Sequence, residues 1–139
     1  MSMNAAEVVN TMMKNDTFSQ WLGIEVLEIR EGYCKLGMTV KENMLNGFGI
    51  AHGGISYSLA DSALAFASNS WGRKSVSIDT SISHLKPLNN KDEVIAEAIC
   101  ENQSEKLGHY AIKVYLKAQP HTAIALFRGT VYRTSKIWE

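Results

Sequence analysis

A long apolar stretch with a single charge constrains this chain more than any other feature. From His52 to Trp71 nearly every side chain is small or apolar, and Asp61 is the only formal charge. A helix that is apolar on most of its faces has to be buried. An ionised carboxylate buried without partners is costly, so Asp61 either receives hydrogen bonds or has a chemical task. The stretch therefore predicts a central helix whose carboxylate needs an explanation.

Two glycines, Gly53 and Gly54, stand where this helix begins. The first backbone N–H groups of a helix have no acceptor within the helix, and they bind oxyanions or polarised carbonyl oxygens well. A donor that must approach a carbonyl closely cannot carry a Cβ, which gives Gly53 a reason to be glycine. The alternative is a glycine that is merely tolerated at a helix start. The donors and the carboxylate together suggest acyl chemistry.

The composition excludes several classes of protein. A chain of 139 residues accommodates one domain with its own core and is too short for two ordinary ones. Basic and acidic residues both number 14 and form no basic run, so we expect no nucleic-acid partner. No apolar run reaches the roughly 18 residues of a membrane span, so we expect a soluble protein. The spacing of Cys34 and Cys100 and the absence of a basic signal region indicate the reducing cytoplasm.

The remaining patterns predict one further helix and six strands. Helical spacing over residues 5–14 predicts a short helix capped by Asn4. Alternation over 24–30 and 33–40, with Glu31-Gly32 between them, predicts a hairpin. Four more strands follow the central helix, which we expect to succeed one another as hairpins: 75–85, 94–101, 109–117 and 122–133. This is an α+β pattern in which an antiparallel sheet wraps around the buried helix.

The helix start carries a recognisable motif. Residues 46–61 read N-G-x(4)-H-G-G-x(4)-L-A-D, and A-L-F-R-G follows at 125–129. The chain resembles, over nearly its whole length, the PaaI-type acyl-coenzyme A thioesterases of the hotdog-fold superfamily. The resemblance implies a single hotdog domain over 1–139, with an N-terminal helical segment at about 1–22. It also implies homodimers that join two sheets edge to edge, commonly homotetramers, and hydrolysis of acyl-CoA to free acid and CoA.

Two residues of the motif have structural alternatives. Asn46 can form a tight turn, or it can direct its amide over the helix start; the resemblance implies that it helps to hold the substrate carbonyl or the attacking water. His52 can cap the helix or reach the leaving-group sulfur, and the resemblance favours the second role. We expect no metal, because His84, His109 and His121 fall in other elements without close ligand spacing.

The spacing of Gly53 and Asp61 predicts a site shared by two chains. Asp61 follows Gly53 by eight residues, roughly 12 Å along a helix axis, which is too far for both to reach one thioester carbon. If the helices of two subunits lie antiparallel across a two-fold axis, Asp61 of one faces Gly53 of the other, and two equivalent sites arise. The alternative for Asp61 is a structural carboxylate. Ser77 and Thr80 are candidate partners of Asp61 or its water, or ordinary strand hydroxyls.

In such a site Asp61 acts either as general base or as nucleophile, and the sequence leaves both open. We expect the acyl group to enter a slot between the subunits, with Gly54, Met44 and Leu64 among the substrate-binding residues. The resemblance suggests aryl-acetyl or hydroxylated aryl-acetyl thioesters as substrates, with CoA as part of the substrate and no cofactor. Basic residues near strand ends either receive the phosphates of CoA or form ordinary surface: Arg73, Lys74, Lys86, Arg128 and Arg133.

Two other functions compete with hydrolysis. A hydratase or dehydratase of the same fold would use a histidine and an acid for proton transfer at carbon, whereas the glycine donors and Asn46 are better suited to polarising a carbonyl. A non-catalytic acyl-CoA-binding protein would use the same residues for binding alone. Turnover of a thioester, lost on substitution of Asp61, separates the three.

Overall fold

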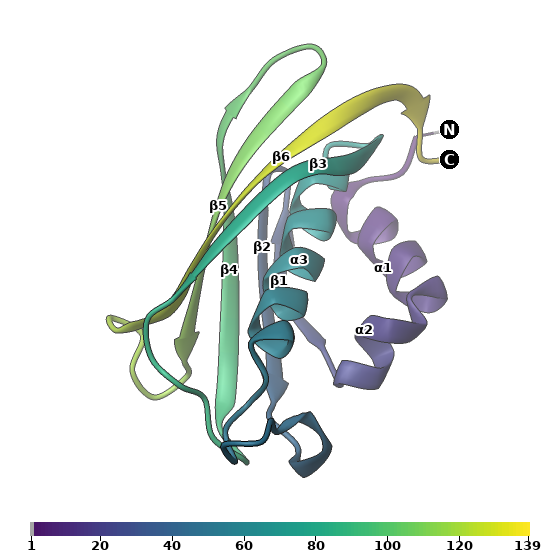
Figure 1. Ribbon diagram of the computed structural model, residues 1–139. Helices are drawn as coiled ribbons and strands as arrows, with labels where there is room; N and C mark the ends of the chain where they lie inside the picture. The colour runs from purple at the N-terminus through teal and green to yellow at the C-terminus, as the bar shows by residue number, and fades with distance from the viewer. Residues whose placement is uncertain (1) are drawn as a thin grey trace.

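A six-stranded antiparallel sheet curves around one central helix (Figure 1). The computed structural model describes residues 2–139, and Met1 of the predicted N-terminal segment lies outside them. Among these residues no helix is both long and apolar enough to cross a membrane. The elements in chain order are α1 (Ala5–Asn15), α2 (Thr17–Leu22), β1 (Glu25–Arg30), β2 (Tyr33–Thr39), a short 3₁₀ helix (Glu42–Met44), α3 (Gly53–Asn69), β3 (Arg73–His84), β4 (Glu93–Gln103), β5 (Leu107–Leu116) and β6 (Ala123–Ile137).

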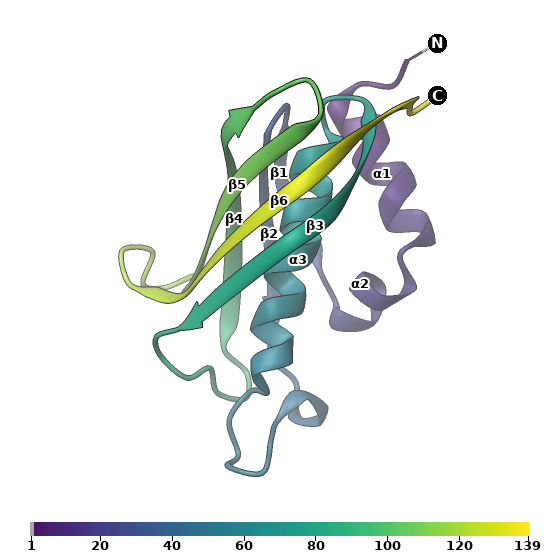
Figure 2. The same cartoon turned by 45° about the horizontal axis from the view of Figure 1, so that its top comes forward.

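The strand order is β1-β2-β4-β5-β6-β3. The predicted β1–β2 hairpin is confirmed, with Glu25 opposite Gly37. The prediction that all four later strands succeed one another as hairpins is wrong for β3, which pairs with β6, while β4 pairs with β2. The connection after β3 contains Pro87, which has no N–H to donate to a ladder. β3 thus lies at an edge of the sheet, where it crosses in front of α3 beside β6 (Figure 2).

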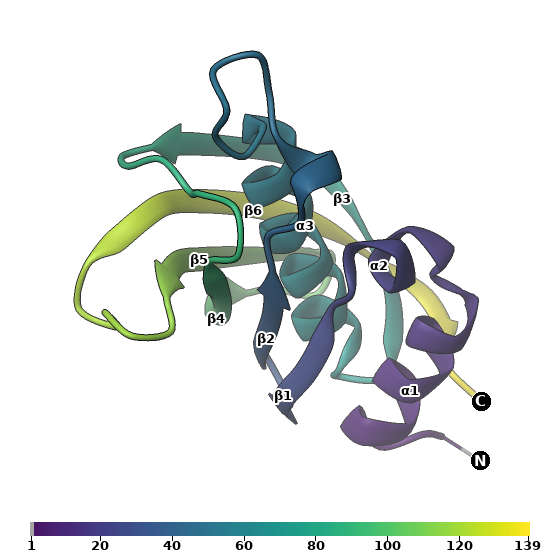
Figure 3. The same ribbon diagram turned by 90° about the horizontal axis from the view of Figure 1, so that it is seen from below.

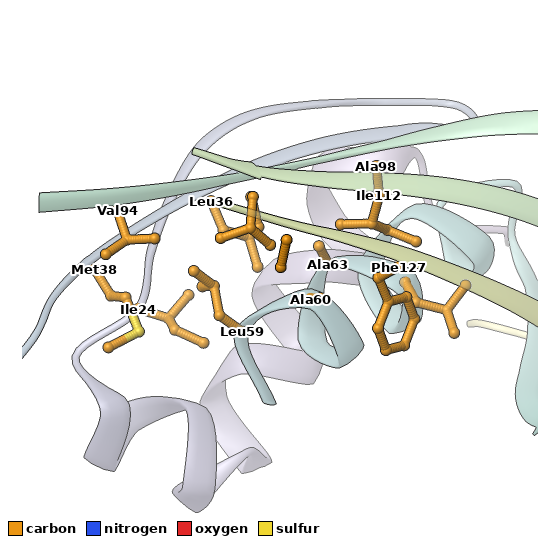
Figure 4. Close-up of a cluster of buried hydrophobic side chains, with 14 of the residues drawn as sticks. Ile24, Leu36, Met38, Leu59, Ala60, Ala63, Val94, Ala98, Ile112 and Phe127 are labelled. Atoms are coloured by element: carbon orange, nitrogen blue, oxygen red, sulfur yellow. The ribbon is translucent and has the colours of Figure 1, made fainter. Parts of the chain in front are cut away.

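Helix α3 is buried because its residues are apolar on nearly every face. Leu59 and Phe66 are fully buried, and each such side chain contributes about 1.5–3 kcal/mol through removal from water. Strand β6 approaches α3 so closely that a Cβ on Gly129 would lie 2.5 Å from Leu64 Cδ2. The buried side chains that meet the helix come from four strands, β2, β4, β5 and β6, and from the chain before β1, and Figure 4 labels ten residues of the cluster: Ile24, Leu36, Met38, Leu59, Ala60, Ala63, Val94, Ala98, Ile112 and Phe127.

The N-terminal helices cover the side of α3 that the sheet leaves open (Figure 3). Helix α1 was predicted, and Asn4 caps it in a capping box with Glu7. Helix α2 falls within the helical segment of about 1–22 that the resemblance implied, but no helical period marked it as a separate helix, because six residues are too few. Its boundaries are nevertheless present in the sequence, since Asp16 accepts a hydrogen bond from the Ser19 N–H and Gly23 ends the helix with a φ of 75°.

Candidate active site

The start of α3 keeps one backbone donor free. His52 is the N-cap, and its Nδ1 accepts the Gly54 N–H at 2.9 Å, while its carbonyl oxygen accepts the Ile55 N–H at 2.9 Å. Within residues 2–139 no acceptor bonds the Gly53 N–H. His52 therefore caps the helix, and the N–H of Gly54 is used by that cap. The N–H of Gly53 remains open at the positive end of the helix.

Asn46 both forms a turn and lies beside Gly53. Its Oδ1 accepts hydrogen bonds from the Phe48 N–H at 2.9 Å and the Ile50 N–H at 3.4 Å. Its side-chain NH₂ has no hydrogen-bond partner among the described residues. Asn46 and Gly53 line one cavity of about 400 Å³. This cavity, called the Gly53 cavity below, is thus lined by two residues with unbonded donors, the Gly53 N–H and the Asn46 side-chain amide.

Asp61 lies in a second cavity of about 260 Å³, called the Asp61 cavity below. The carboxylate is half-buried, and no donor in the described part of the chain bonds its side chain. Burial raises the pKa of Asp61 above its ordinary value, and the negative charge of Asp16 raises it further. The carboxylate is therefore not held as a structural acceptor, and it faces a cavity whose other lining residues include Met12, Leu64, Ala65, Ser68, Ser77 and Val131.

The N-terminal helices bring a second carboxylate toward Asp61. The Ser19 hydroxyl donates to Asp16 Oδ2 at 2.6 Å, and it contacts the Ser62 hydroxyl at 2.8 Å. Ser19 is fully buried, so its contacts hold Asp16 close to Ser62, the residue that follows Asp61 on α3. The sequence analysis missed Asp16, because its relation to Asp61 depends on how α1 and α2 pack on α3.

The other predicted substrate-binding residues divide into two groups. Leu64 and Ser77 line the Asp61 cavity, as described. Thr80 instead bonds the Tyr57 hydroxyl. Met44 is buried in the core and lines neither cavity. Ser77 thus lines the cavity of the carboxylate, and Thr80 does not. Within residues 2–139 no cluster of three or more His, Cys, Asp or Glu is arranged to hold a metal ion.

His84 is a residue of the Gly53 cavity that the sequence analysis considered only as a metal ligand. It ends β3, and its Nε2 lies 3.2 Å from the position that a Cβ on Gly53 would occupy. On the other side of the ring, Nδ1 lies 3.3 Å from the Ser56 hydroxyl. No motif marked His84, because its position depends on where β3 ends relative to the start of α3.

Comparison with known proteins identifies the family. The sequence model of the thioesterase superfamily matches residues 48–122. The acyl-coenzyme A thioesterase PaaI of Escherichia coli is 37% identical over 133 residues, which is 96% of this chain and 94% of the relative. This chain belongs to the thioesterase superfamily. It is a thioester hydrolase with the fold that the sequence predicted.

Solved structures of the superfamily agree with this fold. The structure of E. coli PaaI, from the phenylacetic acid degradation operon, matches with a TM-score of 0.92 at 35% identity, covering 96% of this chain and 95% of the other. The phenylacetic acid degradation protein PaaI of Thermus thermophilus matches with a TM-score of 0.81 at 35% identity, covering 86% and 100%. A Streptococcus mutans protein, solved with acetyl-CoA, shares the fold at 23% identity with a TM-score of 0.78, covering 83% and 91%.

Proposed function

We propose that this thioesterase hydrolyses acyl-CoA to free acid and CoA at sites shared by two copies of the chain. The observation that carries the proposal is the separation of the open Gly53 donor and the Asp61 carboxylate into two cavities of one chain. The named activity of E. coli PaaI and the acetyl-CoA in the Streptococcus mutans structure support CoA thioesters as the substrate class. The phenylacetic acid operon of the E. coli relative supports aryl-acetyl or hydroxylated aryl-acetyl groups.

The exposed edge of the sheet supports a dimer. Among residues 2–139 β3 pairs only with β6, so its outer backbone groups are free to pair with another strand, and Val76 and Ile78 are 57% and 59% exposed there. If β3 pairs antiparallel with its own copy across a two-fold axis, the Ser77 end of one strand lies beside the His84 end of the other. The Asp61 cavity is at the first end and the Gly53 cavity is at the second. This pairing would bring Asp61 of one chain toward Gly53 of its partner.

Further assembly and location are part of the same proposal. The exposed, stacked rings of Phe18 and Trp21 on α2 offer an apolar surface on which two dimers could join as a homotetramer. The free thiols of Cys34 and Cys100 are compatible with the reducing cytoplasm. Water is the only co-reactant that hydrolysis needs, so we propose no cofactor and no metal, with CoA entering as part of the substrate.

The proposed reaction begins with the acyl carbonyl oxygen at the Gly53 N–H, assisted by the Asn46 amide. As base, the partner chain's Asp61 takes a proton from water while the water oxygen bonds the carbonyl carbon; the C–S bond then breaks, and the thiolate leaves and is protonated. As nucleophile, the Asp61 carboxylate bonds the carbonyl carbon, the C–S bond breaks and the thiolate leaves; water then cleaves the resulting anhydride, which restores the carboxylate, releases the acid and supplies the proton that the thiolate takes up. The raised pKa of Asp61 favours the base. Ser77 lines the same cavity as the carboxylate, and His52 caps the start of α3.

A panel of acyl-CoA substrates, assayed for free thiol, tests the proposal. We expect turnover of phenylacetyl-CoA and related aryl-acetyl thioesters, and loss of that turnover in Asp61→Asn. Binding of acyl-CoA without thiol release would instead favour the non-catalytic alternative, and addition of water to an enoyl thioester would favour the hydratase. A single turnover in ¹⁸O-labelled water reports on the mechanism: label in the Asp61 carboxylate shows a nucleophile whose anhydride is cleaved at the Asp61 carbonyl carbon, whereas a base places the label only in the product acid.

A further inference from the structure

We propose that His84 contacts the substrate and recognises the amide N–H that lies two carbons from the thioester sulfur in CoA and other pantetheine thiols. The inference rests on the proposed function and adds a determinant for the thiol half of the substrate. It begins with a hydrogen-bond chain at the start of α3. The Ser56 hydroxyl donates to the Gly53 carbonyl oxygen at 3.2 Å and lies 3.3 Å from His84 Nδ1.

This chain of contacts suits one tautomer of His84. A hydroxyl has one hydrogen, and when Ser56 gives it to the Gly53 carbonyl oxygen, Ser56 accepts at its contact with His84. In that arrangement the neutral ring carries its proton on Nδ1 and presents a lone pair on Nε2. Ser56 is buried, with 5% of its surface exposed, so its hydroxyl is held at the start of α3.

The lone pair of His84 lies beside the donors of the Gly53 cavity. Nε2 and Cε1 are 3.2 and 3.4 Å from the position of a Cβ on Gly53, and His84 lines the same cavity as Gly53 and Asn46. The cavity thus presents donors for a carbonyl oxygen and, next to them, one acceptor. A thioester group has no hydrogen to give to that acceptor, so the acceptor must serve another part of the substrate or a water molecule.

The chemistry of the thiol arm supplies the missing donor. In an acyl-CoA the sequence after the carbonyl is sulfur, two methylene groups and an amide N–H, so a substrate whose oxygen lies on the Gly53 N–H carries a donor only a few bonds away. Beyond His84 the cavity is lined by the apolar Leu85 and Ile124 and by Lys86. Apolar walls suit the methylene groups of the arm, and a lysine suits the phosphates at its far end.

Two substrates with the same acyl group test this assignment. The N-acetylcysteamine thioester keeps the amide N–H, and the n-butyl thioester lacks it. In the wild type we expect kcat/KM to favour the first by about 10-fold, the equivalent of one hydrogen bond. His84→Phe keeps a flat ring against Gly53 and removes the acceptor, so the ratio should fall to about 1. Ser56→Ala should lower the ratio in the same direction, because Nδ1 loses its partner.

Three controls make the result decisive. His84→Gln offers a side-chain oxygen as acceptor and should retain part of the preference, which separates a lost hydrogen bond from a lost fold. His121→Phe, in the exposed turn before β6, makes the same substitution outside the cavity and should leave the ratio unchanged. Acyl-CoA assayed in parallel reports on the proposed function alone, and its failure to turn over would overturn that function. An unchanged ratio in His84→Phe, or equal wild-type values for the two thioesters, would overturn the role of His84 and leave the proposed function standing.

Discussion

Asp61 is the residue at which the fold and the proposed chemistry conflict. Burial and the charge of Asp16 raise its pKa in the folded chain above its value in the unfolded chain. For a carboxyl group with a raised folded-state pKa, the linked stability is present when the group is protonated and is lost as pH rises through the folded-state pKa. At neutral pH the ionised Asp61 therefore costs stability, which a purely structural residue would not be selected to do.

We predict that Asp61→Asn abolishes thioester turnover and raises the melting temperature at pH 7. The amide keeps the shape of the side chain and removes the charge from its half-buried position. The gain in melting temperature should shrink as pH falls toward about 4, where an ordinary carboxyl group is itself protonated. Thiol-release assays and thermal denaturation at several pH values measure both effects. Activity within about threefold of the wild type would rule out the proposed mechanism.

Substitutions of His52 test whether the start of α3 needs only a helix cap or also a contact with the substrate. The structure uses its Nδ1 to accept the Gly54 N–H. We predict that His52→Ala lowers stability by about 1 kcal/mol, the usual cost of a lost N-cap, and lowers activity because Gly53 is less well held. His52→Asn can cap in the same way and should recover most of both. If Asn restores stability but not activity, the imidazole itself acts on the substrate, as the resemblance implied.

At the scale of the element, the start of α3 requires a residue without a side chain. We predict that Gly53→Ala lowers kcat by about 100-fold with a smaller change in KM, because the added Cβ keeps the oxygen off the Gly53 N–H, and one oxyanion donor is worth roughly 3 kcal/mol in the transition state. The added Cβ would also lie 3.2 Å from His84 Nε2 and displace that ring. Gly47→Ala is the matched control, since its Cβ would meet nothing within 4 Å. A change confined to KM would make Gly53 a packing residue.

Asp16, at the junction of α1 and α2, allows the pKa of Asp61 to be changed without substituting Asp61 itself. We predict that Asp16→Asn lowers the pKa of Asp61, because the change removes the second cause of its rise. The acid limb of the pH profile of kcat should then move to lower pH. Asparagine is also a good N-cap, so α2 should persist. Glu25→Gln, which removes an exposed carboxylate on β1, should leave the profile in place. An unmoved acid limb in Asp16→Asn would show that the two carboxylates do not interact.

The elements differ in how well the sequence predicted them, for physical reasons. Helix α3 and all six strands were predicted, because a long apolar run and period-two alternation are local signals. The pairing of β3 with β6 was not predicted, because alternation indicates a strand but does not indicate which strand lies next to it. The motif marked Gly53 and Asp61 as candidate site residues, and the rise of a helix predicted that they lie too far apart to share one site within a chain. His84 and Asp16 were missed, because each reaches its place only through tertiary packing.

At the scale of the whole molecule, one chain holds the two halves of the proposed site in two separate cavities. The Gly53 cavity lies at the end of β3 and the Asp61 cavity at its beginning, so a monomer has donors without a carboxylate and a carboxylate without donors. Antiparallel pairing of β3 with its copy would complete two sites at once. The assembly would then be a condition of activity rather than an addition to it.

A mixture of two inactive variants tests this directly. Asp61→Asn alone and Gly53→Val alone should both be inactive, but a heterodimer of the two has one site with both groups native and one site with both groups altered. Random exchange makes about half of the dimers heterodimers, so activity should recover to about a quarter of the wild-type value if the sites are independent. Mass spectrometry establishes that exchange has occurred, and each variant exchanged with itself is the control. Exchange without recovery would place the whole site within one chain and would contradict the argument from both helix rise and strand pairing.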